Sequence, residues 1–244
     1  MPSDVAVAAE AARAAAAVLV ELRSGGLEGR ALRDAGDAGA QQAILAVLTT
    51  ERPGDVVFSE EAADDRRRLS ADRVWIVDPL DGTREYGDPA RQDWAVHVAL
   101  WADGELTAAA VALPALGEVH VTDPAPGAPA RPDGVRVAVS RSRAPAVATA
   151  VADALGGELV LLGSAGYKTL AVVRGEVDAY VHAGGMYQWD SAAPVAVARA
   201  AGLTACRLDG SPLVYNTPEP WLPDLVVCRP ELAEPILAAV RSSS

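Results

Sequence analysis

The chain has 244 residues, half of them hydrophobic, and a formal net charge of −12. This length and composition allow a full-sized core, arranged as one large domain or as two lobes. The negative charge argues against binding to a nucleic-acid backbone, which needs a basic surface. It still allows a small phosphorylated substrate, because metal ions can supply positive charge locally. The oligomeric state is left open.

Neither a signal peptide nor a membrane span is expected. The first twenty residues include Asp4, Glu10 and Arg13 and lack a long apolar core. No stretch reaches the roughly 18 uninterrupted apolar residues that cross a bilayer. Cys206 and Cys228 form neither a CxxC motif nor a disulfide framework, which favours a reduced setting. We therefore expect a cytoplasmic protein with no membrane partner.

Two helices are predicted at the start of the chain. An alanine-rich stretch over residues 5–23 ends before Ser24-Gly25-Gly26, which is typical of a helix with a glycine stop. A second helix is predicted over residues 39–50, where apolar side chains recur on one face, and Pro53-Gly54 ends it.

Strands are predicted to follow these helices. Residues 56–58 and 73–77 form short apolar runs that end in carboxylates. The stretch 94–123 has strand patterns on both sides of a turn at Asp103-Gly104, which predicts antiparallel pairing. Residues 123–134 are rich in proline, glycine and alanine, and they are predicted to be a linker or a long loop.

The second half of the chain alternates strands with helices, which indicates an α/β arrangement. We therefore expect an α+β lobe over residues 1–130 with most of the metal ligands. An α/β lobe over residues 131–244 would hold the substrate contacts and the last ligand. The predicted strands there are 135–140, 158–164 and 177–183, and the predicted helices are 144–157, 165–176 and 191–202.

Five carboxylates stand at expected strand ends or helix starts, where α/β proteins build their sites. They are Asp37, Glu60, Asp78, Asp81 and Asp190. Two anions as close as Asp78 and Asp81 repel each other unless a cation joins them. Oxygen ligands of this kind suit magnesium or calcium, so the pattern predicts a site for divalent metal ions.

The turn between these two aspartates is also suited to holding an anion. Pro79 stiffens the turn, and Gly82 lets the backbone approach a ligand closely. The amides of Gly82 and Thr83 could then bind a phosphate group. Metal ions and backbone donors around a phosphate are typical of a phosphatase.

Three motifs together resemble a known family. They are "DPLDGT" (78–83), "SEE" (59–61) upstream and "WDSAAP" (189–194) downstream. In this order the chain, over roughly residues 5–230, is similar to the inositol-monophosphatase superfamily of lithium-sensitive, magnesium-dependent phosphatases. The resemblance implies a layered αβαβα sandwich of the inositol monophosphatase and fructose-1,6-bisphosphatase type.

Further motifs resemble the bacterial 3′(2′),5′-bisphosphate nucleotidase branch of that superfamily. They are "VWIVDPLDGTREY" (74–86), "VAVSRSR" (137–143) and "GSAGYK" (163–168). This branch removes the 3′-phosphate from 3′-phosphoadenosine 5′-phosphate to give AMP, a step linked to sulfate assimilation. Inositol monophosphatase and fructose-1,6-bisphosphatase activities are the alternatives on the same fold.

The resemblance also implies a role for each matching residue. The metal ligands would be Glu60, Asp78, the backbone carbonyl of Leu80, Asp81 and Asp190. Asp37 and Thr83 would orient and deprotonate the attacking water. The substrate contacts would be Gly82, Thr83, Ser140, Arg141, Ser164 and Lys168.

The implied cofactor is magnesium, as two ions. A third ion is left open, because the segment "GLEGRALRDAGD" (26–37) is shorter than the family's pattern and lacks its Val-Thr pair. The segment 182–190 also differs, since it has no basic residue where some nucleotidases place one against the second phosphate.

Two readings outside this family remain open. A haloacid-dehalogenase-type phosphatase also places aspartates before Gly-Thr, but its nucleophile and acid–base partner lie two positions apart, against three here for Asp78 and Asp81. A non-catalytic protein that binds metal and phosphate is the other reading. It has no need of the water-activating pair Asp37 and Thr83.

Overall fold

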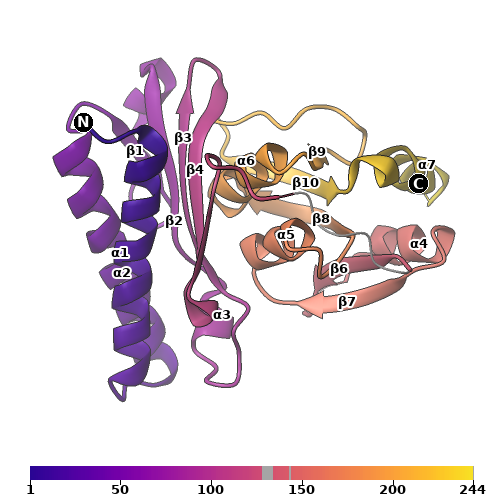
Figure 1. Ribbon diagram of the computed structural model, residues 1–244, viewed down its shortest axis with the longest axis horizontal. Helices are drawn as coiled ribbons and strands as arrows, with labels where there is room; N and C mark the ends of the chain where they lie inside the picture. The colour runs from indigo at the N-terminus through magenta and orange to yellow at the C-terminus, as the bar shows by residue number, and fades with distance from the viewer. Residues whose placement is uncertain (128–133, 143, 244) are drawn as a thin grey trace.

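The computed structural model describes residues 1–127, 134–142 and 144–243, which form five layers (Figure 1). Two helices cover the outer face of one five-stranded sheet, and two others cover the outer face of a second sheet. A further pair of helices lies between the sheets. This is the αβαβα sandwich that the sequence predicted, so the expected fold class is confirmed.

The first layer consists of α1 (Asp4–Ser24) and α2 (Gly29–Glu51), which pack on each other. Helix α1 buries alanines, Val7 and Leu19 against the sheet and exposes Glu10 and Arg13. Small alanine side chains let this helix lie close to the strands. No helix among the described residues is long and apolar enough to cross a membrane.

The first sheet has the order β1-β2-β3-β4-β5. Strand β1 is parallel to β2, and the other neighbours are antiparallel. The turn at Asp103-Gly104 joins β3 and β4 as predicted, with positive φ angles at both residues. The bounds are β1 Val56–Ser59, β2 Arg73–Asp81, β3 Ala95–Ala102, β4 Glu105–Leu113 and β5 Glu118–Val121.

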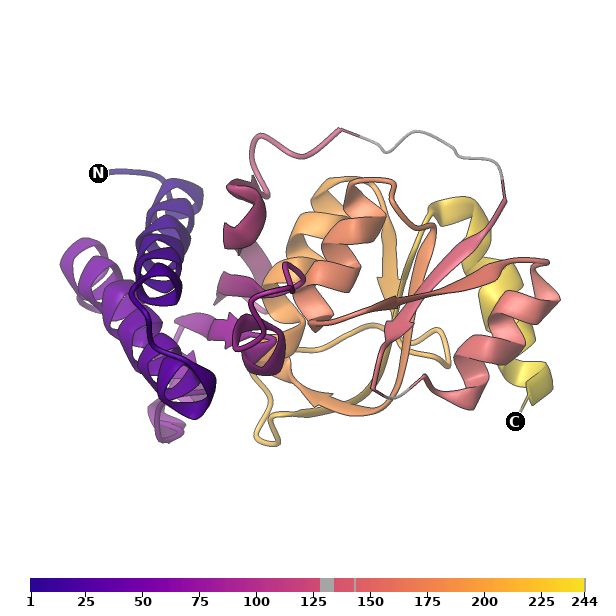
Figure 2. The ribbon, with the colours of Figure 1, turned by 90° about the horizontal axis from the view of Figure 1, so that it is seen from below.

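The second sheet has the order β7-β6-β8-β10-β9. Helices α5 and α6 lie between the sheets, and α4 and α7 cover the far side, at the opposite end of the molecule from α1 and α2 (Figure 2). The strands are β6 Arg136–Ser140, β7 Glu158–Leu162, β8 Ala179–Tyr187, β9 Thr204–Cys206 and β10 Trp221–Cys228. The helices are α4 Ala146–Ala154, α5 Ala165–Val173, α6 Ala192–Ala200 and α7 Ala233–Ser243.

One buried cluster joins the two sheets through the middle helices. It runs from Phe58 and Ile76 in the first sheet, through Leu170 and Val195, to Leu225 in the second. Consecutive residues of α6 are buried because a sheet lies on either side of this helix. The first sheet uses residues before the predicted boundary at residue 130, and the second sheet uses residues after it. The division into lobes 1–130 and 131–244 stays a prediction, because this core is continuous across them.

The predicted start of the second helix is wrong. The helix begins at Gly29 instead of residue 39, so Asp37 lies inside it and not ahead of it. Gly36 is tolerated there because the side chains of Tyr86 and Leu80 pack so close that an added Cβ would lie 2.7 and 3.2 Å from them. This tertiary contact offsets the poor helix propensity of glycine.

Two other differences concern strands. The strand predicted over residues 73–77 continues to Asp81, so both aspartates of the turn belong to the strand end. No element was predicted beyond residue 202, although β9, β10 and α7 lie there. Part of the predicted linker, residues 128–133, lies outside the described residues.

Candidate metal centre and substrate site

The end of β2 presents two buried aspartates through an irregularity in its pairing with β3. Asp78 lies opposite His97, Asp81 lies opposite Ala95, and the register shifts between them. Pro79 has no N–H to give to the ladder, and the Asp78 carboxylate accepts the Leu80 N–H at 3.0 Å. The strand therefore bends within three residues and keeps both carboxylates at one place.

Gly82 turns the chain from this strand into α3 (Thr83–Tyr86). Its φ angle of +88° lies in the left-handed region that favours glycine. A Cβ here would also lie 2.9 Å from Cβ of Ser164 and 3.2 Å from Cβ of Trp94. The hydroxyl of Thr83 donates to the carbonyl oxygen of Leu80 at 3.2 Å. The predicted phosphate-binding turn is thus tightly packed against the turn that precedes α5.

Three other predicted ligands act electrostatically on Asp78. The charges of Glu60, just after β1, and of Asp81 and Asp190 all raise its pKa. The atoms that lie close enough together to hold one ion belong to Asp78, Asp81 and His97. Asp190 ends the short helix before α6, where its carboxylate accepts the Tyr187 N–H at 2.7 Å. Acidic side chains from three separate segments therefore act on one another as an acidic cluster, with Asp78 and Asp81 buried, Asp190 partly buried and Glu60 exposed.

Burial and mutual repulsion dominate the electrostatics of this cluster. Burial, then the carboxylates of Glu60, Asp81 and Asp190, raises the pKa of Asp78 well above its usual range. Burial and the charge of Asp81 likewise raise the pKa of Asp190 to about 7. Burial also acts to raise the pKa of Asp81, but the adjacent His97 ring and the Gly166 amide outweigh it and lower that pKa.

The cluster fits a hard divalent cation. The Oδ2 atom of Asp78 is buried and has no hydrogen-bond partner among the described residues. An orphaned carboxylate oxygen costs free energy unless a cation or donor reaches it. Carboxylate and carbonyl oxygens are the ligands that magnesium and calcium prefer. The donor set is therefore suited to the metal site that the sequence predicted.

His97 belongs to the cluster, although sequence reasoning did not place it there. The ring is fully buried on β3, with Nδ1 3.1 Å from the Trp189 carbonyl oxygen and 3.8 Å from Oδ2 of Asp78. Its Nε2 lies 3.3 Å from Oδ2 of Asp81. Spacing along the sequence gives no signal for these contacts, because they depend on the register of β3 against β2.

Neighbouring carboxylates also act on Asp37. It is half-buried on α2, and burial, then the charges of Glu61 and Glu60, raises its pKa to about 7. Arg33 opposes this shift. A carboxylate with a pKa near neutrality is suited to accept and release a proton. The structure thus places Asp37 beside the cluster, from the interior of a helix.

Ser164 and Lys168 lie at the start of α5. The Ser164 hydroxyl caps the helix by accepting the Tyr167 N–H at 2.9 Å. Lys168 is only 3% exposed, and its ammonium group donates to the carbonyl oxygens of Gly163 and Ser164. Burial lowers its pKa to about 8. Lys168 therefore holds the turn that carries Ser164 and offers little surface of its own to a substrate.

Ser140 ends β6, and Arg141 follows it directly. The Ser140 and Ser142 hydroxyl oxygens lie 3.2 Å apart, and Arg141 donates to Oδ2 of Asp93 at 3.1 Å. The last residue of the motif, at position 143, lies outside the described residues. Asp93 was not singled out in the sequence, where "RQDWAV" has no distinguishing pattern.

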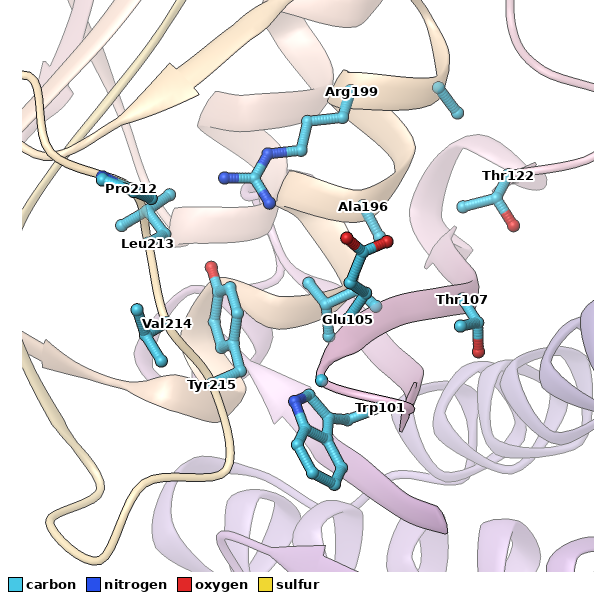
Figure 3. A pocket seen from close by; sticks show the side chains of 13 residues that line it. Trp101, Glu105, Thr107, Thr122, Ala196, Arg199, Pro212, Leu213, Val214 and Tyr215 are labelled. Carbon is cyan, nitrogen blue, oxygen red and sulfur yellow. The ribbon is translucent and has the colours of Figure 1, made fainter. Parts of the chain in front are cut away.

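A separate cavity of about 630 Å³ lies between the β3–β4 hairpin, α6 and the chain before β10. Figure 3 shows Trp101, Glu105, Arg199 and Tyr215 around it. It includes none of the predicted site residues. One residue that lines the cavity, Tyr215, approaches the acidic residues. Its hydroxyl lies 3.1 Å from the hydroxyl of Ser191, the residue after Asp190. The cavity is therefore distinct from the acidic cluster.

Comparison with known proteins identifies the class to which this fold and site belong. The model of the "Inositol monophosphatase family" matches residues 3–244. The chain belongs to this family of metal-dependent phosphatases. The resemblance that the motifs indicated is thus confirmed, and the haloacid-dehalogenase reading is wrong.

The similar sequences carry more specific names. A protein of Mycobacterium leprae named "3'-phosphoadenosine 5'-phosphate phosphatase" is 51% identical over 98% of this chain and 94% of its own length. A protein of the same name from Mycobacterium tuberculosis is 53% identical over 86% of this chain and 82% of its own length. The Escherichia coli protein "3'(2'),5'-bisphosphate nucleotidase CysQ" is 31% identical, with 77% and 81% coverage.

Solved structures show the same fold. The crystal structure of CysQ from Bacteroides thetaiotaomicron superposes with a TM-score of 0.80 at 26% identity, covering 93% of this chain and 97% of that one. An inositol monophosphatase from Staphylococcus aureus has a TM-score of 0.82 at 18% identity, with 95% and 93% coverage.

Metal binding should change how stability depends on pH. The folded, metal-free protein keeps protons on Asp78 and Asp190 that the unfolded chain releases near pH 4. Raised pKa values give stability that is present at low pH and is lost as pH rises through the folded pKa. We therefore expect the melting temperature in EDTA to fall between about pH 5 and 8, and the gain on adding magnesium to grow.

Asp190→Asn is the informative variant for this measurement, because asparagine can still accept the Tyr187 N–H while carrying no charge. It should melt higher than the wild type at about pH 8 in EDTA and gain less from magnesium. A wild-type melting temperature that stays level across this range in EDTA would contradict the electrostatic account.

Proposed function

We propose that the chain is a magnesium-dependent phosphomonoesterase that converts 3′-phosphoadenosine 5′-phosphate to AMP by removing its 3′-phosphate. The buried pair Asp78 and Asp81 at the end of β2, on which the charges of Glu60 and Asp190 act, is the observation that supports the chemistry. The similarity to mycobacterial proteins named for this substrate supports the choice of nucleotide. A cytoplasmic location remains part of the proposal.

The proposed metal ligands are the four clustered carboxylates and the backbone carbonyl of Leu80. When bound, magnesium lowers the pKa of a water and stabilises negative charge on phosphate oxygens. The chain itself contributes a fixed set of oxygens, so that little reorganisation is needed during the reaction. The number of ions is proposed as two, with a third left open.

Asp37 and Thr83 are proposed to handle the proton of the attacking water. The Thr83 hydroxyl gives its hydrogen to Leu80, so its oxygen lone pairs can accept one from the water and orient it. The Asp37 carboxylate, with a pKa of about 7, can then take the proton. Asp37 thus acts as general base while Thr83 positions the nucleophile.

The remaining contacts are proposed to hold the substrate. The backbone amides of Gly82 and Thr83 would bind the phosphate that is cleaved. Ser140, Ser164 and Arg141 would face the rest of the nucleotide. The burial of Lys168 indicates that it supports the Ser164 turn and reaches the nucleotide less directly.

The proposal predicts a clear order of substrates. Phosphate release should depend on magnesium and should be fastest, judged by kcat/KM, with 3′-phosphoadenosine 5′-phosphate. Inositol monophosphate and fructose 1,6-bisphosphate should follow, because the same metal chemistry acts on them without the nucleotide contacts. Nucleotide turnover no faster than inositol phosphate turnover would remove the nucleotidase assignment and leave a general phosphatase.

Asp37→Asn separates an enzyme from a protein that only binds metal and phosphate. We expect kcat to fall at least about a hundredfold, as for loss of a general base, while substrate binding measured by calorimetry is retained. Asp34→Asn is the matched control, because Asp34 lies on the same helix, exposed and paired with Arg30. If the wild type, the control and Asp37→Asn all bind substrate and none turns it over, the chain is a binding protein.

A further inference from the structure

A buried carboxylate outside the metal cluster links several segments of the proposed substrate site. Asp93 lies between α3 and β3 and is 4% exposed. Its Oδ2 accepts the Gly163 N–H at 2.5 Å and the Arg141 guanidinium at 3.1 Å. Its backbone carbonyl accepts the Ser164 N–H at 3.1 Å. One residue thus holds two turns of the second sheet against the first.

These contacts continue directly into the phosphate-binding turn. Trp94, the next residue, packs so closely on Gly82 that a Cβ there would lie 3.2 Å from Cβ of Trp94. Gly163 is equally confined, since its own Cβ would lie 2.7 Å from Oδ2 of Asp93 and 2.6 Å from Cγ of Glu85. The spacing between the Gly82 turn and the Gly163 turn is therefore set by the Asp93-Trp94 pair.

Asp93 also fixes a cation in this region. Arg141 is an exposed residue whose Nη2 contacts Asp93 and the Leu161 carbonyl oxygen, and whose Nη1 lies 4.0 Å from Oε1 of Glu85. Its Nε–H makes no hydrogen bond to any described residue, so donor capacity remains for a ligand. A held guanidinium with free donors is well suited to a phosphate group.

Among the predicted substrate contacts, Arg141 and Lys168 are the cations that could meet a second phosphate. The segment 182–190 contains no lysine or arginine, and Lys168 is buried beneath its own turn. Arg91, the other arginine on Asp93, lies on the same carboxylate and helps to hold it. Of the cations predicted to contact the substrate, Arg141 is the more accessible, with 35% of its side chain exposed.

Taking the proposed function as given, we propose that Asp93 is a positioning residue for recognition of the second phosphate. It holds the Arg141 guanidinium and the Gly163-Ser164 turn at a fixed distance from Gly82, where the cleaved phosphate binds. A substrate with phosphates on both the 3′ and the 5′ carbon would bind the Gly82 turn with one phosphate and Arg141 with the other. A substrate with one phosphate would gain nothing from the held Arg141 guanidinium.

Asp93→Asn tests this role with the shape of the side chain preserved. Its amide oxygen can still accept the Gly163 N–H, but the charge that holds Arg141 is lost. We expect KM for 3′-phosphoadenosine 5′-phosphate to rise about tenfold, with kcat within about twofold. With adenosine 3′-monophosphate, which lacks the 5′-phosphate, both constants should stay within about twofold of the wild type.

Asp88→Asn is the matched control, because Asp88 lies in the same loop and, among the described residues, its carboxylate accepts the exposed Ala90 N–H alone. It should leave KM unchanged for both substrates. Arg141→Gln removes the other partner of the same contact. Because Arg141 is more exposed than Asp93, this variant should fold and reproduce the selective rise in KM even if Asp93→Asn folds poorly. The double variant should be no worse than the stronger single variant, because the two residues act through one contact.

Several results would overturn the inference. An equal rise in KM for both substrates, or a fall in kcat for both, would mean that Asp93 only maintains the fold. Effects of Asp93→Asn and Arg141→Gln that multiply in the double variant would mean that they act separately. A wild-type enzyme that does not release phosphate from 3′-phosphoadenosine 5′-phosphate in magnesium would instead refute the proposed function.

Discussion

The site depends on repulsion among carboxylates that the fold holds together away from water. Asp78 and Asp81 are buried, Asp190 is partly buried, and the charges of Glu60, Asp81 and Asp190 act on Asp78. Removing carboxylates from water and bringing them into contact costs free energy, as the raised pKa values of Asp78 and Asp190 show. A divalent cation reverses this balance, because each oxygen that repels its neighbours then attracts the ion. The protein thus builds the site as an unfavourable arrangement that a metal ion makes favourable.

The layered fold explains how distant parts of the chain supply this arrangement. Parallel strands β1 and β2 end side by side and deliver Glu60 and Asp78, while the antiparallel β3 brings His97 opposite Asp78. Helices α5 and α6 lie between the sheets, and their starts bring Ser164 and Asp190 to the same end of β2. The core that joins both sheets keeps these elements from moving independently. Rigid placement of this kind is what metal-dependent catalysis requires.

Local patterns in the sequence indicated an α/β arrangement and acidic residues at strand ends, and the family resemblance implied the αβαβα sandwich; the ligand roles stay a prediction. "DPLDGT" follows a strand, and the strand–helix alternation after residue 134 is regular. The start of α2 was missed because Gly29 and Gly36 are poor helix formers, whereas packing of Tyr86 and Leu80 around Gly36 stabilises the helix. His97 and Asp93 were missed for a related reason. Their roles arise from strand register and from contacts over some 20 to 70 residues of chain, which a single sequence does not reveal.

The central claim is that Glu60, Asp78, Asp81 and Asp190 bind divalent cations together. A crystal structure with manganese in place of magnesium, measured at a wavelength where manganese scatters anomalously, tests it directly. The account predicts anomalous peaks among these four side chains, about 2.0–2.3 Å from their oxygens, beside the Leu80 carbonyl. Four side chains that diverge with no peak between them, in crystals grown with excess manganese at neutral pH, would contradict it.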